Sequence, residues 1–106
     1  MDDPLPSSPY CATLVVDEAI TKPDALAAVA RAIAGSVQRA GSAEPFVALN
    51  GGDWAEVEIP KFGEAPPLAI DVFSADSREH AEASALALLD RLVAATGWRV
   101  RPMFER

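Results

Sequence analysis

Apolar and polar positions alternate in some segments of this chain and repeat at helical spacing in others. Alternation with a period of two, typical of half-buried strands, runs through residues 54–59, 68–73 and 98–102. Residues 10–16, YCATLVV, are apolar and rich in β-branched side chains, and they also predict a strand. Apolar residues follow a helical spacing in two segments, residues 21–41 and 76–97.

The first predicted helix has its apolar stripe on Leu26, Val29, Ala30, Ile33 and Val37. Thr21 is a suitable N-cap, and Pro23 fits the first turn because a backbone N–H there has no helical partner. Gly41 is expected to end the helix. The Gly35-Ser36 pair inside it marks either a weak point or close packing against a sheet.

The second predicted helix has its apolar stripe on Ala81, Ala85, Leu88, Leu89 and Leu92. Asp76 followed by Glu79 resembles a capping box, with Ser74 and Ser77 as competing caps. Gly97 is expected to end this helix.

Two short features lie between the predicted helices. Residues 46–49 are a candidate short strand. The NGGD sequence at 50–53 predicts a tight turn, since Asn and Gly adopt positive φ at low cost. The alternative interpretation of NGGD is a nest of backbone amides that binds an anion.

The elements follow the order strand, helix, strand, strand, helix, strand. This order resembles the ferredoxin-like, or split βαβ, fold. It predicts an α+β domain over residues 10–106, with a four-stranded antiparallel sheet in the strand order 4-1-3-2 and both helices on one face, after a flexible arm of residues 1–9. The second and fourth strands would be the edges. Charges and prolines fit edges because they block edge-to-edge pairing, and these strands carry Glu56, Glu58, Pro60, Arg99, Arg101 and Pro102.

The sheet face away from the helices is the first candidate binding surface. The alternation places on it Cys11, Thr13, Val15, Trp54, Glu56, Glu58, Asp71, Phe73, Arg99 and Arg101. Pairing Val57 with Ile70, and Ile59 with Leu68, keeps the core residues together. It also sets Trp54 opposite Phe73 and Glu56 opposite Asp71, so an aromatic pair lies beside a like-charge pair.

The carboxylate pair has three interpretations. The first is a surface on which Glu56 and Asp71 are either solvated or neutralised by Arg99 or Arg101. The second is a contact with another subunit or a partner protein. The third is a cation site or a catalytic site, which is the weakest because carboxylates without further ligands seldom hold a metal.

The loop at residues 60–67, PKFGEAPP, is the second candidate binding element. Its three prolines make it stiff, which lowers the entropy lost on contact with a partner. Phe62, beside Lys61, either packs onto the core of the domain or projects as a recognition anchor. The loop is therefore either a connector or a recognition loop.

The net charge narrows the choice of partners. The 106 residues include 9 basic and 16 acidic side chains, a formal net charge of −7. Such a chain repels phosphates, which disfavours nucleic acid and anionic membranes, whereas a basic protein partner remains compatible. The N-terminal residues lack the basic and apolar regions of a signal peptide, so a cytoplasmic location is expected.

The residues with catalytic potential form no known motif. The single cysteine, Cys11, excludes an intramolecular disulfide and is interpreted as a small apolar filler rather than a nucleophile. The single histidine, His80, excludes a multi-histidine metal site within one chain and is expected on the solvated side of its helix. No spacing marks a Ser-His-Asp triad or a phosphate-binding loop, so no cofactor or metal is expected and the sequence favours a non-enzyme.

These patterns favour one function over two alternatives. The favoured one is a small acidic non-catalytic module with a protein-interaction or regulatory role, forming a homodimer through the open sheet face. One alternative is a small-molecule sensor with its ligand at a dimer interface. The other is a small enzyme with a site on the open face of the sheet.

Overall fold

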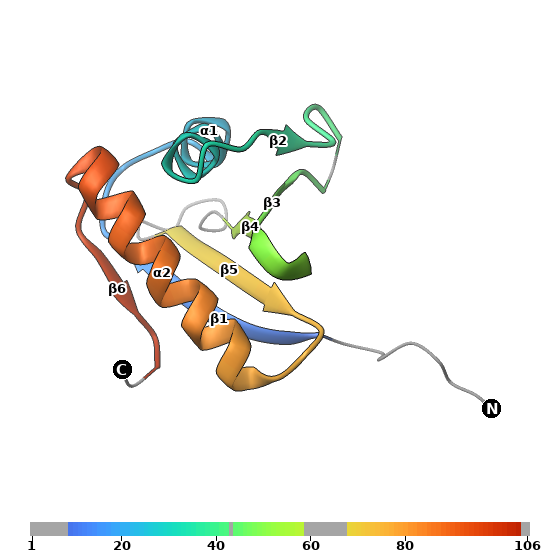
Figure 1. The fold of residues 1–106 in the computed structure, drawn as a ribbon. Helices are drawn as coiled ribbons and strands as arrows, with labels where there is room; N and C mark the ends of the chain where they lie inside the picture. Colours follow the sequence, from blue (N-terminus) through green and yellow to red (C-terminus); the bar gives the residue numbers. More distant parts are fainter. Residues whose placement is uncertain (1–8, 43, 59–67, 105–106) are drawn as a thin grey trace.

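The computed structural model describes residues 9–42, 44–58 and 68–104 (Figure 1). The helical segments are α1 (Lys22–Ala32), the short 3-10 turn η1 (Asn50–Gly52) and α2 (Arg78–Thr96). The strands are β1 (Tyr10–Val16), β2 (Val37–Gln38), β3 (Phe46–Ala48), β4 (Trp54–Glu58), β5 (Leu68–Ser74) and β6 (Val100–Pro102). The predicted α+β class is therefore confirmed, whereas the predicted arm lies, except for Pro9, outside the described residues.

The six strands of the described residues join in one antiparallel sheet with the order β2-β3-β4-β5-β1-β6. The predicted four-stranded ferredoxin-like order is not matched, because the sheet has six strands and β2 and β3 extend it beyond β4. The expectation that β4 is an edge is wrong for the same reason. The η1 turn brings β3 back alongside β4, where Val47 pairs with Ala55 and Ala48 with Trp54.

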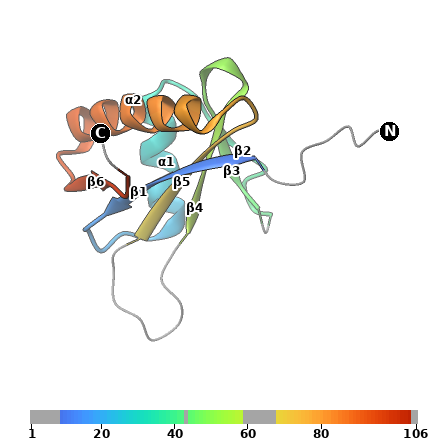
Figure 2. The same cartoon turned by 90° about the horizontal axis from the view of Figure 1, so that it is seen from below.

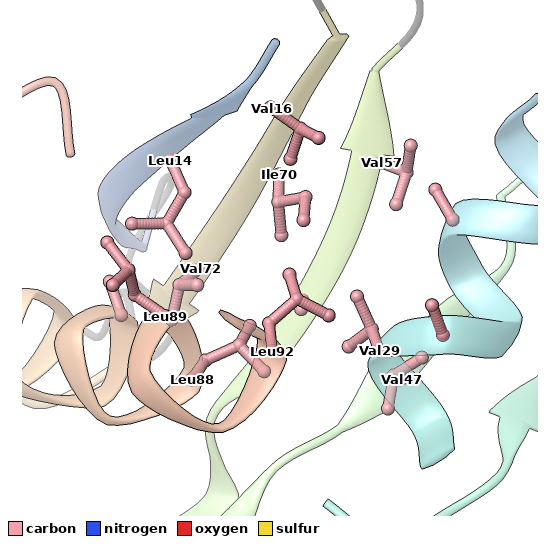
Figure 3. Close-up of a cluster of buried hydrophobic side chains, with 14 of the residues drawn as sticks. Leu14, Val16, Val29, Val47, Val57, Ile70, Val72, Leu88, Leu89 and Leu92 are labelled. Carbon is pink, nitrogen blue, oxygen red and sulfur yellow. The ribbon is translucent and has the colours of Figure 1, made fainter. Parts of the chain in front are cut away.

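The core lies between the two helices and one face of the sheet (Figure 3). α2 packs against β1, β5 and β6, α1 packs against β2, β3 and β4, and the helices contact each other. Figure 2 shows the strands from below, with α2 along one side of them. Fully buried residues of the two layers include Leu14, Val16, Val29, Val47, Val57, Ile70, Val72, Leu88 and Leu92. Burial of such side chains stabilises the fold by about 1.5–3 kcal/mol each.

The first helix begins as predicted and ends early. The hydroxyl oxygen of Thr21 accepts a hydrogen bond from the backbone N–H of Asp24 at 3.2 Å, which confirms the N-cap. The helix stops at Ala32 rather than near Gly41. Ala34 has φ 58°, and the N–H of Gly35 donates to the carbonyl of Ala30 at 2.8 Å, so the last turn closes on itself.

A short strand, β2, replaces the helical turns that were expected around Val37. Val37 was expected on the helical stripe, but it lies in β2 opposite Val47 of β3. A β-branched residue is favoured in a strand, where Val37 packs beside its cross-strand partner. In the interior of a helix the same residue is less favoured. Gly35-Ser36 is thus the break between helix and strand.

The second helix follows the predicted stripe and stop. Ala81, Ala85, Leu88, Leu89 and Leu92 are all buried, and Gly97 ends the helix in the left-handed region with φ 75°. The cap is Ser77, whose Oγ accepts from the N–H of His80 at 3.0 Å. The preferred capping box at Asp76 is wrong, because the backbone N–H of Asp76 instead donates to Ser74 Oγ at 3.1 Å in a local turn.

Gly97 provides a test of the predicted helix end. Its left-handed backbone suits glycine, and a β-carbon there would meet no atom within 4 Å, so strain rather than a clash limits substitution. We expect Gly97→Ala to lower the free energy of unfolding by about 1–2 kcal/mol. Gly97→Asn should cost less, because asparagine tolerates this conformation. Equal melting temperatures for the two variants in calorimetry would contradict this account of the helix end.

Candidate functional site

The sheet face away from the helices, here called the open face, is the largest candidate site. Its residues alternate with the core residues along the strands, and they are Cys11, Thr13 and Val15 of β1, Phe46 and Ala48 of β3, Trp54, Glu56 and Glu58 of β4, Ala69, Asp71 and Phe73 of β5, and Arg101 of β6. Val15 is buried, Trp54, Glu56, Asp71 and Phe73 are half-buried, and Arg101 is exposed. Arg99 precedes β6 and is exposed as well.

The predicted strand register is confirmed across the described part of the β4–β5 hairpin. Trp54 lies opposite Phe73, Glu56 opposite Asp71 and Val57 opposite Ile70. Ile59, the predicted partner of Leu68, lies outside the described residues. The rings of Trp54 and Phe73 stack, with centroids 5.4 Å apart and planes 18° from parallel. Such a cross-strand pair contributes about 0.2–1 kcal/mol.

Neutral donors, not arginines, compensate the carboxylate pair at the centre of the face. Thr13 Oγ1 donates to Asp71 Oδ1 at 2.7 Å, from the neighbouring strand β1. Trp54 Nε1 donates to Glu56 Oε2 at 3.0 Å, from the same face of β4. Each carboxylate therefore has a hydrogen-bond donor beside it, which offsets the repulsion that the register imposes.

The two arginines that were expected to neutralise this pair contact other acids. Arg101 Nε lies 3.1 Å from Asp17 Oδ2, and Arg99 Nε lies 3.3 Å from Glu18 Oε2. The chain following β1 places Asp17 and Glu18 beside β6. They are closer to the two arginines than the carboxylates on β4 and β5 are. Within the described residues, neither arginine pairs with Glu56 or Asp71, so neutralisation by arginine, one of the interpretations of the carboxylate pair, is wrong.

Cys11 lies on the open face opposite Phe73. Burial raises the pKa of the Cys11 thiol, and the carboxylates of Asp71 and Glu56 raise it further, against the lowering effect of Thr13, whose Oγ1 is 3.8 Å from the sulfur. A thiol with a raised pKa holds little thiolate at neutral pH, so it is a poor nucleophile.

A cavity of about 320 Å³ opens beside Trp54 at the β3 end of the open face. It is lined by Arg39, Glu44, Phe46, Ala48, Leu49, Gly52, Asp53, Trp54 and Glu56. The guanidinium of Arg39 lies over the ring of Phe46, 5.9 Å from its centroid, and the two groups form a cation–π contact. The sequence pattern did not predict the roles of Arg39, Glu44 and Phe46, and the short strand expected at 46–49 was the only signal that pointed to this region.

A buried carboxylate lies under this cavity. Asp53 is 3% exposed, and its Oδ2 accepts a hydrogen bond from Ser84 Oγ. His80 Nε2 lies 2.9 Å from the same oxygen, in a contact without hydrogen-bond geometry. His80 and Ser84 are one turn apart on α2, so both reach the same point. His80 was expected to be solvated on the polar side of its helix; its side chain is 42% exposed, and its Nε2 is buried against Asp53.

These three residues are not arranged as a catalytic triad. In a triad the hydroxyl donates to the imidazole, whose other nitrogen is held by the carboxylate. Here the hydroxyl of Ser84 donates to Asp53, and His80 faces that same oxygen. The group therefore links α2 to the turn before β4. The predicted tight NGGD turn is confirmed as η1, with Gly51 at φ 76° and Gly52 at φ 87°, and Gly51 lies next to His80.

Two further findings concern the described part of the chain alone. Within it, no group of three or more His, Cys, Asp or Glu residues is placed to hold a metal ion. No described helix combines the length and apolar character needed to cross a membrane. Lys61, Phe62 and the rest of the 60–67 loop lie outside the described residues, so the choice between connector and recognition loop stays a prediction.

The buried carboxylate gives a stability test. We expect Asp53→Ala to lower the free energy of unfolding by about 1–3 kcal/mol, because it leaves Ser84 and His80 without their partner. Asp76→Ala is the control, since Asp76 is an exposed acid nearby and should change stability by less than about 0.5 kcal/mol. Denaturant unfolding measures both, and equal stability of the two variants would show that the link from α2 to η1 does not stabilise the fold.

The thiol gives a test that depends on pH. Asp71→Asn removes one carboxylate that raises the pKa of Cys11, so more thiolate exists at any pH below that pKa. We expect iodoacetamide to alkylate Cys11 faster in this variant, with the rate rising at lower pH than in the parent. Glu58→Gln is the control, an acid of the same face that does not act on the pKa of Cys11. If Glu58→Gln accelerates alkylation as much as Asp71→Asn, the proposed electrostatic environment of Cys11 is wrong.

No family model, no curated protein and no solved structure matches the chain. The features that bear on function are those described above: the stacked aromatic pair, the compensated carboxylates and the cavity beside Trp54.

Proposed function

We propose that this chain is a small acidic, non-catalytic interaction module of the cytoplasm that forms a homodimer through its open face. The observation that carries the proposal is the stacked Trp54–Phe73 pair in the middle of a sheet face that the described helices do not cover. Both rings are half-buried within a single chain. Aromatic side chains at the centre of a surface are typical anchors of protein interfaces, because they bury a large area at low entropic cost.

The charges of the open face favour a second copy of this chain as the partner. Glu56, Glu58 and Asp71 form an acidic centre on β4 and β5, while Arg99 and Arg101 lie at the β6 edge. A two-fold axis through such a face sets the basic edge of one copy against the acidic centre of the other. The arginines are available for this exchange, since their side chains are 77% and 59% exposed and exposed ion pairs contribute little.

The alternatives have less support. In the part of the chain that the structure describes, the candidate nucleophiles are not activated, because the Cys11 thiol on the open face has a raised pKa and the Ser84 hydroxyl on α2 donates to Asp53. A basic protein partner could meet the same acidic centre and would compete with the second copy. The sensor alternative is favoured by one observation, the cavity that Arg39, Phe46 and Trp54 line.

Light scattering on the purified chain tests the homodimer. We expect a mass of twice the 11.2 kDa chain at high micromolar concentration. Arg101→Glu should raise the dissociation constant at least about tenfold, because it sets acid against acid across the interface. Arg31→Glu makes the same charge change at an exposed position on α1 and should leave the mass unchanged. A mass of one chain at the highest soluble concentration would refute self-association, and binding only to a basic protein would favour the competing partner.

A further inference from the structure

The cavity beside Trp54 has the size of a small-ligand pocket. Its volume of about 320 Å³ is near the lower end of the range of such sites, which is about 300–1,000 Å³. Two aromatic rings, those of Phe46 and Trp54, form its apolar walls. Four charged residues line it: Arg39, Glu44, Asp53 and Glu56. The carboxylate of Asp53 is buried and accepts from Ser84 Oγ, so Arg39, Glu44 and Glu56 are left to contribute charge to the cavity. Apolar walls with a few polar groups are the usual composition of a site that orients a ligand.

The three charged groups are able to take part in binding. Arg39 forms no ion pair within the described residues, and its guanidinium is held in place by the Phe46 ring. The side chain of Glu44 likewise has no partner within that part of the chain. Glu56 accepts from Trp54 Nε1 through Oε2, and a carboxylate has a second oxygen that can accept as well.

The backbone at Arg39 supports a role in binding. Arg39 has φ 54°, in the left-handed region that a residue with a β-carbon seldom adopts. The turn is closed by the N–H of Ser42, which donates to the carbonyl of Arg39 at 3.0 Å. Strained residues of this kind concentrate at ligand sites, where the strain fixes a side chain in position. The conformation places the guanidinium on the rim of the cavity, over Phe46.

The mixed lining selects the class of ligand. A simple anion would meet Arg39 but also two carboxylates, and a simple cation would meet both carboxylates but also Arg39. A zwitterion matches all three, since a guanidinium binds a carboxylate in a two-pronged contact and carboxylates bind an ammonium group. The rings of Phe46 and Trp54 are then left to contact an apolar side chain.

We infer that this cavity binds a small zwitterion with an apolar side chain, such as a free aromatic or aliphatic α-amino acid. Arg39 binds its carboxylate, Glu44 and Glu56 bind its ammonium group, and Phe46 and Trp54 contact its side chain. The inference goes beyond the proposed homodimer. The cavity shares Trp54 and Glu56 with the open face, whereas Arg39 and Glu44 lie in the segment between β2 and β3 and belong to the cavity alone.

Titration calorimetry with L-phenylalanine tests the inference. We expect L-phenylalanine to bind. Phenethylamine, which lacks the carboxylate, and 3-phenylpropionate, which lacks the ammonium group, should each bind at least about tenfold more weakly. Equal binding of all three compounds would mean that the rings alone hold the ligand. No binding of L-phenylalanine, L-leucine or L-tryptophan at millimolar concentration would overturn the inference.

Variants of the two loop residues assign the charged groups. Arg39→Gln should weaken L-phenylalanine at least about tenfold and leave phenethylamine unchanged, since only the first carries a carboxylate. Glu44→Gln should weaken both compounds. Arg31→Gln, a change at an exposed arginine on α1, is the control and should change neither. If Arg39→Gln weakens phenethylamine as much as L-phenylalanine, Arg39 does not bind the carboxylate and the assignment is wrong.

The outcomes separate this inference from the proposed function. Arg39→Gln and Glu44→Gln should weaken the ligand and leave the mass in light scattering unchanged, whereas Arg101→Glu should lower the mass. A dimer without ligand binding would overturn the inference alone. Ligand binding by a monomer would overturn the proposed homodimer alone.

Discussion

One constraint shapes this molecule: two helices cover one face of a six-stranded sheet, and the other face must be stable without them. The strand register sets two carboxylates opposite each other on that face and two aromatic rings beside them. Neighbouring side chains stabilise both the carboxylate pair and the aromatic pair. The rings stack on each other, and a threonine and an indole N–H each donate to a carboxylate. The face is thus stable in water and still offers half-buried aromatic surface to a partner.

The strand pair β2–β3 changes the character of this face. Without it, β4 would be an edge and Trp54 would lie at the border of the sheet. With it, Trp54 is interior to the sheet and the cavity beside it has a second wall, Phe46. The turn that returns β3 to β4 is linked to α2 through Asp53, so one buried carboxylate connects the helix layer with the part of the sheet that forms the cavity.

The sequence alone predicts those features that depend on many residues repeating a pattern. The alternation in residues 54–58 and 68–73 determines the register, because slipping by one position would turn Val57 and Ile70 out of the core. The stripe from Ala81 to Leu92 and the glycine at position 97 determine α2 for a similar reason. The α+β class follows from these elements together.

The features that the sequence does not predict depend on few residues or on distant contacts. A short strand was expected at 46–49, where β3 lies, but β2 has only two residues, too few for alternation to be recognised. The extension of the sheet beyond β4 was therefore missed. The end of α1 depends on Val37 gaining a partner on another strand. The Asp53 group and the cavity join residues far apart in the chain, and no local pattern marks such contacts.

The central claim is that the open face, and not the helix layer, is the surface that binds. The two tryptophans report on it directly, because Trp54 lies on the open face and Trp98 packs against the core. Proton–nitrogen NMR spectra recorded over a dilution series would resolve both indole N–H signals. The account predicts that the Trp54 signal and the amides of β1, β4, β5 and β6 shift with concentration, while the Trp98 indole signal and the exposed side of α1 and α2 do not. Shifts confined to the helices, or spectra that do not change with concentration, would contradict it.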